Sequence, residues 1–236
     1  MEIRRFFVSQ SDIIGDTVTV SGDEFLHMTK VLRYKVGYKA IVCANDGKEY
    51  VCTIKRIAND YAELSIDECK VADRKNVSLT LFAGLLKNNK LDFAIQKSVE
   101  LGVDKIIPFT SANCAETKFS AERANKIALE AAKQCGSAYL SEVGELTDLD
   151  GIINDFKNFD DVLLAYEDEN DTRLTDNIPN GKRIALIVGP EGGFQPEEVA
   201  RMRAAGAKVV TLGRRILRAE TASIVGSALI LSALDF

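Results

Sequence analysis

The stretch "IALIVGPEGGFQPEEV", residues 184–199, decides the fold of the second half of the chain. It begins as an apolar strand, turns at Gly189, Gly192 and Gly193, and enters a helix at Pro196. Glycine is costly to order and is used where φ is positive or where another group must come close to the backbone. The corner is therefore expected to be either a ligand site or a demanding structural turn.

Strands and helices alternate on both sides of this stretch, from Val77 onward. Apolar runs predict buried strands, and runs of helical periodicity, most of them closed by a glycine, predict the helices. Such alternation is typical of an α/β fold with a parallel sheet and helices on its faces. The expected strands are residues 77–86, 105–110, 161–167, 183–189 and 208–213, and the expected helices are residues 90–102, 120–136, 196–206 and 221–234.

The first part of the chain has a different pattern, in which short alternating segments predict a small β-barrel module. Asn45-Asp46-Gly47 marks a tight turn between two of its strands. Ser21 followed by Glu24 predicts a capping box at the start of a helix that continues to Arg33. The polar residues 70–76 form the expected joint, so we expect one domain over residues 1–72 and a second over residues 73–236.

Composition excludes several classes of function. The net charge is −5, so any contact with nucleic acid must come from local patches of lysine and arginine. The five cysteines are far apart and His27 is the one histidine, so no zinc-binding spacing can be assembled and no metal is expected. The longest apolar run is shorter than the roughly 20 residues of a membrane span, and no secretory signal is recognisable. A soluble, cytoplasmic protein is expected.

A phosphate-binding loop is the first interpretation of the glycine corner, and the residues argue against it. Neither G-x-x-x-x-G-K-[ST] nor G-x-G-x-x-G is present. Glu197 and Glu198 fall in the first turn of the following helix, and Glu191 lies within the loop. Carboxylates there would satisfy the positive helix end and repel a phosphate. The corner suits a neutral or a cationic ligand better.

A second corner, "LGRRILRAETA" at residues 212–222, follows the next expected strand and differs in charge. Carboxyl ends of parallel strands share one rim of the sheet, where ligands usually bind. A solvated charge cluster is one interpretation of this corner. A site whose arginines meet an anionic partner is the other, and the interleaved Ile216 and Leu217 favour it. The basic residues, with no acid between them, are Lys208, Arg214, Arg215 and Arg218.

The two corners, "LIVGPEGGF" and "LGRRILRAETA", closely resemble the paired signatures of the RsmE family, the bacterial 16S ribosomal RNA uracil-N3 methyltransferases of the SPOUT class. "RRFF" at residues 4–7 and "HMTKVLR" at residues 27–33 resemble the PUA-like RNA-binding module of that family. Residues 91–108 resemble its first helix and second strand. The chain departs from the family pattern where Arg214 replaces a proline and where Ser137 and Ser141 stand in place of an arginine and a proline.

The resemblance implies a trefoil-knotted parallel-sheet α/β domain preceded by a PUA-like β-barrel. It also implies a homodimer in which the knot helices pack, S-adenosylmethionine as the cofactor, and a uridine of small-subunit ribosomal RNA as the target. A cationic sulfonium agrees with the acidic glycine corner. The residues that the resemblance places at the cofactor are Leu164, Ala165, Gly189, Pro190, Glu191, Gly192, Leu212, Gly213, Ile216, Leu217 and Arg218.

By motif match, Arg218 is the expected catalytic group, which would stabilise the charge that develops on the uracil oxygens. Glu191 is the nearest candidate for a general base, with a loop hydrogen bond as its alternative role. A non-catalytic RNA-binding or ribosome-assembly protein, a SPOUT enzyme with another RNA target and a small-molecule enzyme remain as alternatives. The expected phosphate-contacting residues are Arg4, Arg5, Lys30, Arg33, Lys35, Arg214 and Arg215.

Overall fold

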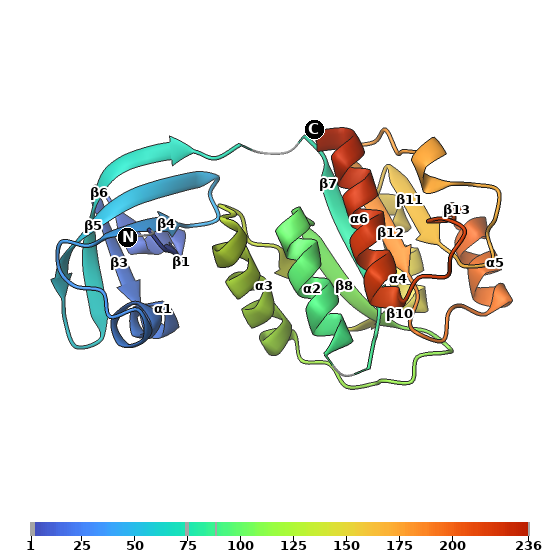
Figure 1. The fold of residues 1–236 in the computed structure, drawn as a ribbon, viewed down its shortest axis with the longest axis horizontal. Helices are drawn as coiled ribbons and strands as arrows, with labels where there is room; N and C mark the ends of the chain where they lie inside the picture. Colours follow the sequence, from blue (N-terminus) through green and yellow to red (C-terminus); the bar gives the residue numbers. More distant parts are fainter. Residues whose placement is uncertain (1–2, 74–75, 88, 236) are drawn as a thin grey trace. The chain divides into compact units, whose positions relative to one another are not determined.

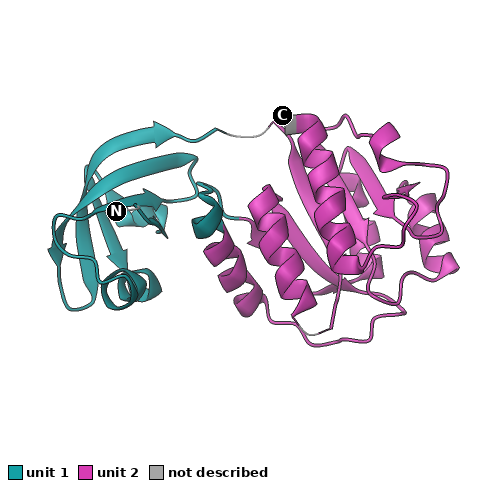
Figure 2. Cartoon of the chain, in the orientation of Figure 1, with its two compact units in different colours: residues 1–74, 132–140 teal, residues 75–131, 141–236 magenta. Residues whose placement is uncertain are grey.

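The structure is a computed structural model, and it describes residues 3–73, 76–87 and 89–235. The chain forms two compact units (Figure 2). Unit 1 comprises residues 1–74 and 132–140, and unit 2 comprises residues 75–131 and 141–236. The assignment of residues 132–140 to unit 1 has no counterpart in the sequence pattern, because the helical periodicity of residues 120–136 runs through the boundary.

Unit 1 is built on a six-stranded sheet in the order β1-β4-β5-β6-β3-β2, curled around an apolar core (Figure 1). β1 and β4 are parallel, and the other neighbours are antiparallel. The predicted tight turn joins β4 to β5, with φ of 53° at Asn45 and 77° at Gly47. The strands are β1 (Arg5–Phe7), β2 (Ile13–Ile14), β3 (Thr17–Ser21), β4 (Lys39–Cys43), β5 (Lys48–Ile57) and β6 (Tyr61–Val71).

The helix of unit 1 begins where the sequence predicts but without the predicted capping box. α1 (Gly22–Leu26) continues into the π-helical turn η2 (His27–Val31), and the Ser21 side chain makes no capping hydrogen bond. The Glu24 carboxylate instead accepts a hydrogen bond from the backbone N–H of Phe7 at 3.2 Å and pairs with Lys133. The prediction was wrong because these tertiary partners hold Glu24 away from the helix start.

Unit 2 contains a parallel seven-stranded sheet with the path β10-β8-β7-β12-β11-β13, to which β9 is added beside β8. The neighbouring strands of this sheet run parallel throughout the described residues, which confirms the predicted α/β class. The short β9 and β10 were not predicted. The strands are β7 (Ser78–Gly84), β8 (Lys105–Thr110), β9 (Glu142–Val143), β10 (Thr147–Asp148), β11 (Asp161–Ala165), β12 (Arg183–Val188) and β13 (Lys208–Val210).

Helices cover both faces of this sheet (Figure 1). α2 and α6 pack side by side over β7 and β12, with α3 beside α2, while α4 and α5 cover the opposite face. Gly226 allows α6 to approach the sheet, because a Cβ there would lie 2.8 Å from Leu186. The helices are α2 (Lys90–Leu101), α3 (Ala121–Cys135), α4 (Leu149–Asp155), α5 (Pro196–Ala204) and α6 (Ala219–Asp235), with 3₁₀ turns η1 (Gln10–Asp12), η3 (Phe156–Asn158) and η4 (Leu174–Asp176).

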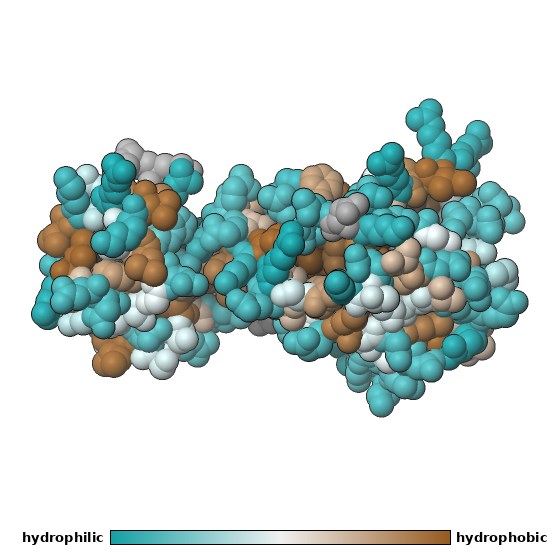
Figure 3. All heavy atoms as spheres, turned by 90° about the horizontal axis from the view of Figure 1, so that it is seen from below, coloured by the Kyte–Doolittle hydropathy of each residue, from teal (hydrophilic) through white to brown (hydrophobic). Residues whose placement is uncertain are grey.

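The core under α4 and α5 fixes the corner that follows β12. Phe82, Phe109 and Phe194 belong to one cluster of buried apolar residues. The rings of Phe109 and Phe194 stack with centroids 6.1 Å apart, so the loop after β12 is anchored to the end of β8. Among the described residues, no helix is long and apolar enough to cross a membrane. On the face drawn in Figure 3, hydrophobic side chains form separate patches among hydrophilic ones.

Candidate active site

The glycine corner packs directly against the end of β7. A Cβ on Gly84 would lie 2.3 Å from the nitrogen of Pro190 and 2.6 Å from the carbonyl carbon of Gly189. Both are backbone atoms that cannot move aside as the end of a side chain can. Gly84 therefore lets two parallel strands, β7 and β12, bring their carboxyl ends into contact, and that contact sets the position of the corner.

At the three glycines of the corner, other residues of the same chain occupy the space that a side chain would need. A Cβ on Gly189 would lie 2.9 Å from the Phe194 ring, and one on Gly192 would lie 2.8 Å from the carbonyl oxygen of Asn113. The Asn113 amide donates to the carbonyl of Gly192 at 3.0 Å. Gly193 has a φ of +66°, which favours glycine. The demanding-turn interpretation is thus confirmed, and it coexists with a cavity on the other side of the loop.

α5 begins with a capping box that also connects it to β8. Glu198 accepts a hydrogen bond from the N–H of Gln195 at 2.9 Å, and its second oxygen accepts one from the N–H of Ala112, also at 2.9 Å. The Glu198 side chain is buried as a result. The carboxylate occupies the amides of the helix start, which agrees with the argument against a phosphate loop.

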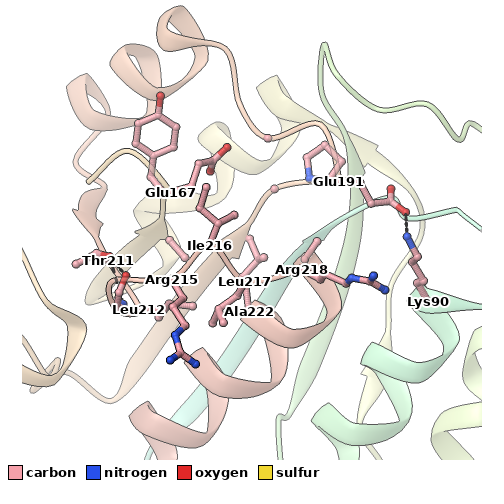
Figure 4. Close-up of a pocket in the computed structure, with 18 residues that line it drawn as sticks. Lys90, Glu167, Glu191, Thr211, Leu212, Arg215, Ile216, Leu217, Arg218 and Ala222 are labelled. Carbon is pink, nitrogen blue, oxygen red and sulfur yellow. Dashed lines mark hydrogen bonds and ion pairs between the residues drawn. The ribbon is translucent and has the colours of Figure 1, made fainter. Parts of the chain in front are cut away.

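A cavity of about 490 Å³ lies between the two corners (Figure 4). The ends of β11, β12 and β13 form one side, and the residues that lead into α6 form the other. Gly213, with a φ of +138°, turns the chain out of β13, and the hydroxyl of Thr211 accepts a hydrogen bond from its N–H at 3.3 Å. The lining residues are Lys90, Ala165, Tyr166, Glu167, Val188, Gly189, Pro190, Glu191, Gly193, Thr211, Leu212, Gly213, Arg215, Ile216, Leu217, Arg218, Ala219 and Ala222.

The cavity brings together all but two of the residues predicted at the cofactor. Leu164 lies in the core beneath β11, and Gly192 packs on Asn113, so neither lines the cavity. Arg215, predicted to contact RNA, lines it instead. Ile216 points into it with an apolar side chain that is 82% exposed, which is typical of a surface that a ligand or partner covers. Contact between these residues and a cofactor remains a prediction.

Sequence reasoning missed four charged or polar members of the cavity, one of which is Thr211, directly after β13. Tyr166 and Glu167 directly follow β11, and only the rule that ligands bind at strand ends could have indicated them. Lys90 starts α2, far away in sequence, and no local signal connects it to residues 189–193. The close approach of β7 to β12 is what brings Lys90 to the site.

Glu191 is held in an ion pair. Its Oε1 accepts hydrogen bonds from the Nζ of Lys90 at 3.0 Å and from the backbone N–H of Lys87 at 3.2 Å (Figure 4). Burial alone would raise the pKa of Glu191, but these two donors outweigh it and hold the pKa below its ordinary value. A carboxylate with a lowered pKa is a weak proton acceptor, so the geometry favours the loop hydrogen-bond role over the general-base role.

The arginines of unit 2 fall into two groups. Four of them each have a carboxylate partner: Arg123 with Asp92, Arg183 with Asp160, Arg201 with Asp150 and Arg203 with Glu169. The other four are exposed and form no ion pair with any described residue, and they all lie beside the arginine corner. This second group is Arg173, Arg214, Arg215 and Arg218.

The basic residues predicted at RNA in unit 1 have different surroundings. Arg4, Lys30, Arg33 and Lys35 are exposed. Arg5 differs from these four residues, because its side chain is only 10% exposed and its Nη1 lies 2.7 Å from Oε1 of Glu49. Arg5 therefore has a structural role at the β1–β4–β5 edge, and its contact with a phosphate stays a prediction.

No group of three or more His, Cys, Asp or Glu side chains within the described ranges is placed to hold a metal ion. His27 packs edge-on against Phe6, with ring centroids 6.2 Å apart. Burial raises the pKa of Cys43 to about 11 and that of Cys52 to about 12, so both stay as thiols near neutral pH.

Comparison with known proteins gives matches along nearly the whole chain. Residues 73–231 match the family described as RNA methyltransferase domain, and residues 20–67 match the RNA methyltransferase PUA domain. Ribosomal RNA small subunit methyltransferase E of Bacillus subtilis is 30% identical, with 94% of this chain and 93% of that protein covered. The protein of the same name from Mesomycoplasma hyopneumoniae is 29% identical, with 93% and 95% covered.

Solved structures share the fold. A ribosomal RNA small subunit methyltransferase E from Neisseria gonorrhoeae, bound to S-adenosyl methionine, superposes with a TM-score of 0.87 at 27% identity over 98% of each chain. A Legionella pneumophila protein in complex with the same cofactor has a TM-score of 0.88 at 26% identity, covering 99% of this chain and 98% of its own. The chain belongs to the ribosomal RNA small subunit methyltransferase E family of RNA methyltransferases.

Proposed function

We propose that this protein is an S-adenosylmethionine-dependent methyltransferase that methylates N3 of a uridine in the RNA of the small ribosomal subunit. The observation that carries the proposal is the cavity between the glycine corner and the arginine corner, in a chain whose full-length relatives are named ribosomal RNA small subunit methyltransferases. An RNA of the ribosome as substrate gives the activity a cytoplasmic location.

The cavity fits S-adenosylmethionine in size and in chemistry. Its volume of about 490 Å³ is within the range of roughly 300–1,000 Å³ that small-molecule sites occupy. Leu212, Leu217 and Ala222 offer apolar walls to an adenine ring, and the Glu167 carboxylate offers a counter-charge to a cationic sulfonium. When bound, this cofactor supplies a methyl group activated by positively charged sulfur.

Arg218 is suited to stabilise the transition state. Uridine N3 carries a proton that must leave for the nitrogen to accept a methyl group, and the resulting negative charge spreads onto the two ring oxygens. The Arg218 side chain is exposed, has no carboxylate partner among the described residues, and extends on the same side of the cavity as the Lys90–Glu191 pair (Figure 4). A guanidinium aimed at developing oxyanion charge lowers the barrier in a site that is partly shielded from water.

The reaction needs no covalent bond between the enzyme and the RNA. Bound S-adenosylmethionine would supply the methyl group, and its sulfur would keep the electron pair of the bond that is lost. Because Glu191 is tied to Lys90 and Lys87, the N3 proton passes to solvent. The protein contributes positioning and charge stabilisation, which are the two largest sources of rate enhancement in such a reaction.

A homodimer through α6 is the assembly that we propose. The buried residues of α6 face its own sheet, and Gly226 is one of them. At 100° per residue, Val225 and Ala228 fall on the opposite face and are only half-buried in the chain by itself. An outward face of small, mostly apolar side chains permits close packing against the same face of a second copy.

Methylation of defined ribosomal particles tests the proposal. The protein would be incubated with methyl-labelled S-adenosylmethionine and small ribosomal subunits that lack their N3-methyluridine, and the digested RNA would be analysed by mass spectrometry. N3-methyluridine should form, and Arg218→Ala should reduce its rate by about 100-fold, as loss of one charge-stabilising donor does. A methyl group on another base would overturn the specificity, and absence of both transfer and cofactor binding would indicate a non-catalytic RNA-binding protein.

A further inference from the structure

A second cavity, of about 550 Å³, adjoins the first at the arginine corner. The two share Thr211, Leu212 and Gly213, so the turn that leaves β13 borders both. The polar side chains of the second cavity come from Asn170, Arg173, Thr175, Thr211 and Arg214, and no acidic residue lines it.

The charges around this cavity are unbalanced. Arg173 and Arg214 belong to the group of exposed arginines without a carboxylate partner among the described residues. Two acidic residues of the same loop, Asp168 and Glu169, are occupied elsewhere, whereas Asp176 accepts a hydrogen bond from the Thr175 hydroxyl at 3.1 Å. Glu169 accepts hydrogen bonds from the N–H groups of Asp171 and Thr172, at 3.0 Å each, and contacts Arg203. Asp168 accepts one from the Tyr166 hydroxyl at 3.1 Å. The cavity thus presents cations with no internal counter-charge.

We infer that the second cavity binds a backbone phosphate of the RNA substrate, next to the nucleotide whose base enters the first cavity. Two guanidinium groups supply the donors that phosphate oxygens accept, and the Asn170 amide, which donates one N–H to the carbonyl of Asp168, has a second N–H to offer. Because residues 211–213 border both cavities, a phosphate in the second cavity lies next to the cavity that receives the reacting base. The inference rests on the proposed function, and it adds Arg173, which no sequence motif indicated.

The occupant is a phosphodiester of RNA because every charged side chain that lines the cavity is cationic. A protein segment would need apolar anchors, and only Leu174, Leu212 and Leu229 contribute apolar side chains here. Arg214 stands where the family signature usually has a proline. The second cationic group of the site is therefore a feature of this chain.

The test compares Arg173→Ala and Arg214→Ala, singly and combined, with Arg183→Ala as the matched control. Arg183 is also exposed, but it is paired with Asp160 at the opposite end of β12, so its loss removes the same charge away from the site. Binding of unmethylated small-subunit RNA would be measured by titration at several salt concentrations without cofactor. Cofactor affinity would be measured by calorimetry, and KM and kcat on the same RNA.

Each site variant should weaken RNA binding about tenfold, as loss of one charged hydrogen-bonding group does. The slope of log K against log salt should fall by about 0.7 to 0.9 for each lost phosphate contact. KM for RNA should rise, while kcat and cofactor affinity should stay within about twofold of the parent. Arg183→Ala should match the parent protein in all five quantities.

Different failures point to different errors. If the parent protein methylates RNA and the site variants behave like Arg183→Ala, the phosphate site is wrong and the proposed function stands. If the variants instead shift the sedimentation of the protein toward monomer without changing the salt slope, the cavity is a subunit contact and the inference is overturned. If the parent protein neither binds nor methylates the RNA, the proposed function itself fails.

Discussion

Glu191 shows how a single contact decides between two chemical roles. Its carboxylate lies in the loop that lines the cavity, where a general base would be useful, but Lys90 and the N–H of Lys87 hold it. Its pKa in the folded protein is lowered, so the stabilisation by this pair is fully present above the unfolded pKa of about 4.3 and is lost as the pH falls through the lower folded value. At the pH of an assay near neutrality Glu191 is an anion, and its lowered pKa makes it a weak proton acceptor.

Glu191→Gln should therefore slow single-turnover methylation by less than about tenfold, whereas loss of a true general base costs roughly 100- to 10,000-fold. The pH profile between pH 6 and 9 should keep its shape, since Glu191 does not titrate there. Lys90→Gln is the matched variant, because it should raise the pKa of Glu191, measurable by NMR, with little effect on rate. A loss of 100-fold or more in Glu191→Gln, accompanied by a changed pH profile, would restore the general-base role.

At the scale of the secondary-structure elements, the contact between the ends of β7 and β12 holds the active site. Gly84→Ala would force a Cβ into backbone atoms of Gly189 and Pro190. We expect a loss of about 2 kcal/mol or more in the free energy of unfolding, as overpacking of a rigid site causes. Because the same residues line the cavity, S-adenosylmethionine affinity should also fall.

Gly144→Ala provides the comparison for this variant. A Cβ there meets its first neighbour, the Ile107 side chain, at 3.6 Å, which is an ordinary contact. Thermal unfolding and calorimetric titration of the two variants separate a general effect of alanine from the specific clash at Gly84. Equal melting temperatures and equal cofactor affinities would contradict the role assigned to Gly84.

The sequence predicts the elements of unit 2 better than it predicts their contacts. The run 183–189 and the helix from Pro196 are confirmed because apolar strands, glycine stops and an N-terminal proline act locally. The contacts of Glu24 and Lys90 could not be predicted, because each side chain pairs with a residue that is far away in the sequence. Charge alone did not reveal the surroundings of Arg5, because the sequence does not distinguish an arginine in an ion pair with Glu49 from an exposed arginine.

On the scale of the whole molecule, the outward face of α6 decides the assembly. Val225→Glu would place a charge on the half-buried face opposite the sheet, where the proposed second copy packs. A buried charge without a partner costs several kcal/mol, so the dimer should dissociate to monomers in sedimentation experiments while the circular dichroism spectrum is unchanged.

Ile14→Glu is the control for that change, because Ile14 is an exposed apolar residue in unit 1, 77% accessible in the chain by itself. It should leave the sedimentation coefficient as it is in the parent protein. If both variants sediment like a parent dimer, α6 is not the interface. If the parent protein itself is a monomer, the proposed assembly is wrong.

The return of the chain to unit 1 at residues 132–140 limits how this protein can be divided. Unit 1 is not contiguous in the sequence. Exchanging residues 1–74 for a foreign module would remove Glu24, whose carboxylate pairs with Lys133. The N-terminal module could be replaced only together with residues 132–140, a nine-residue segment from a later part of the chain.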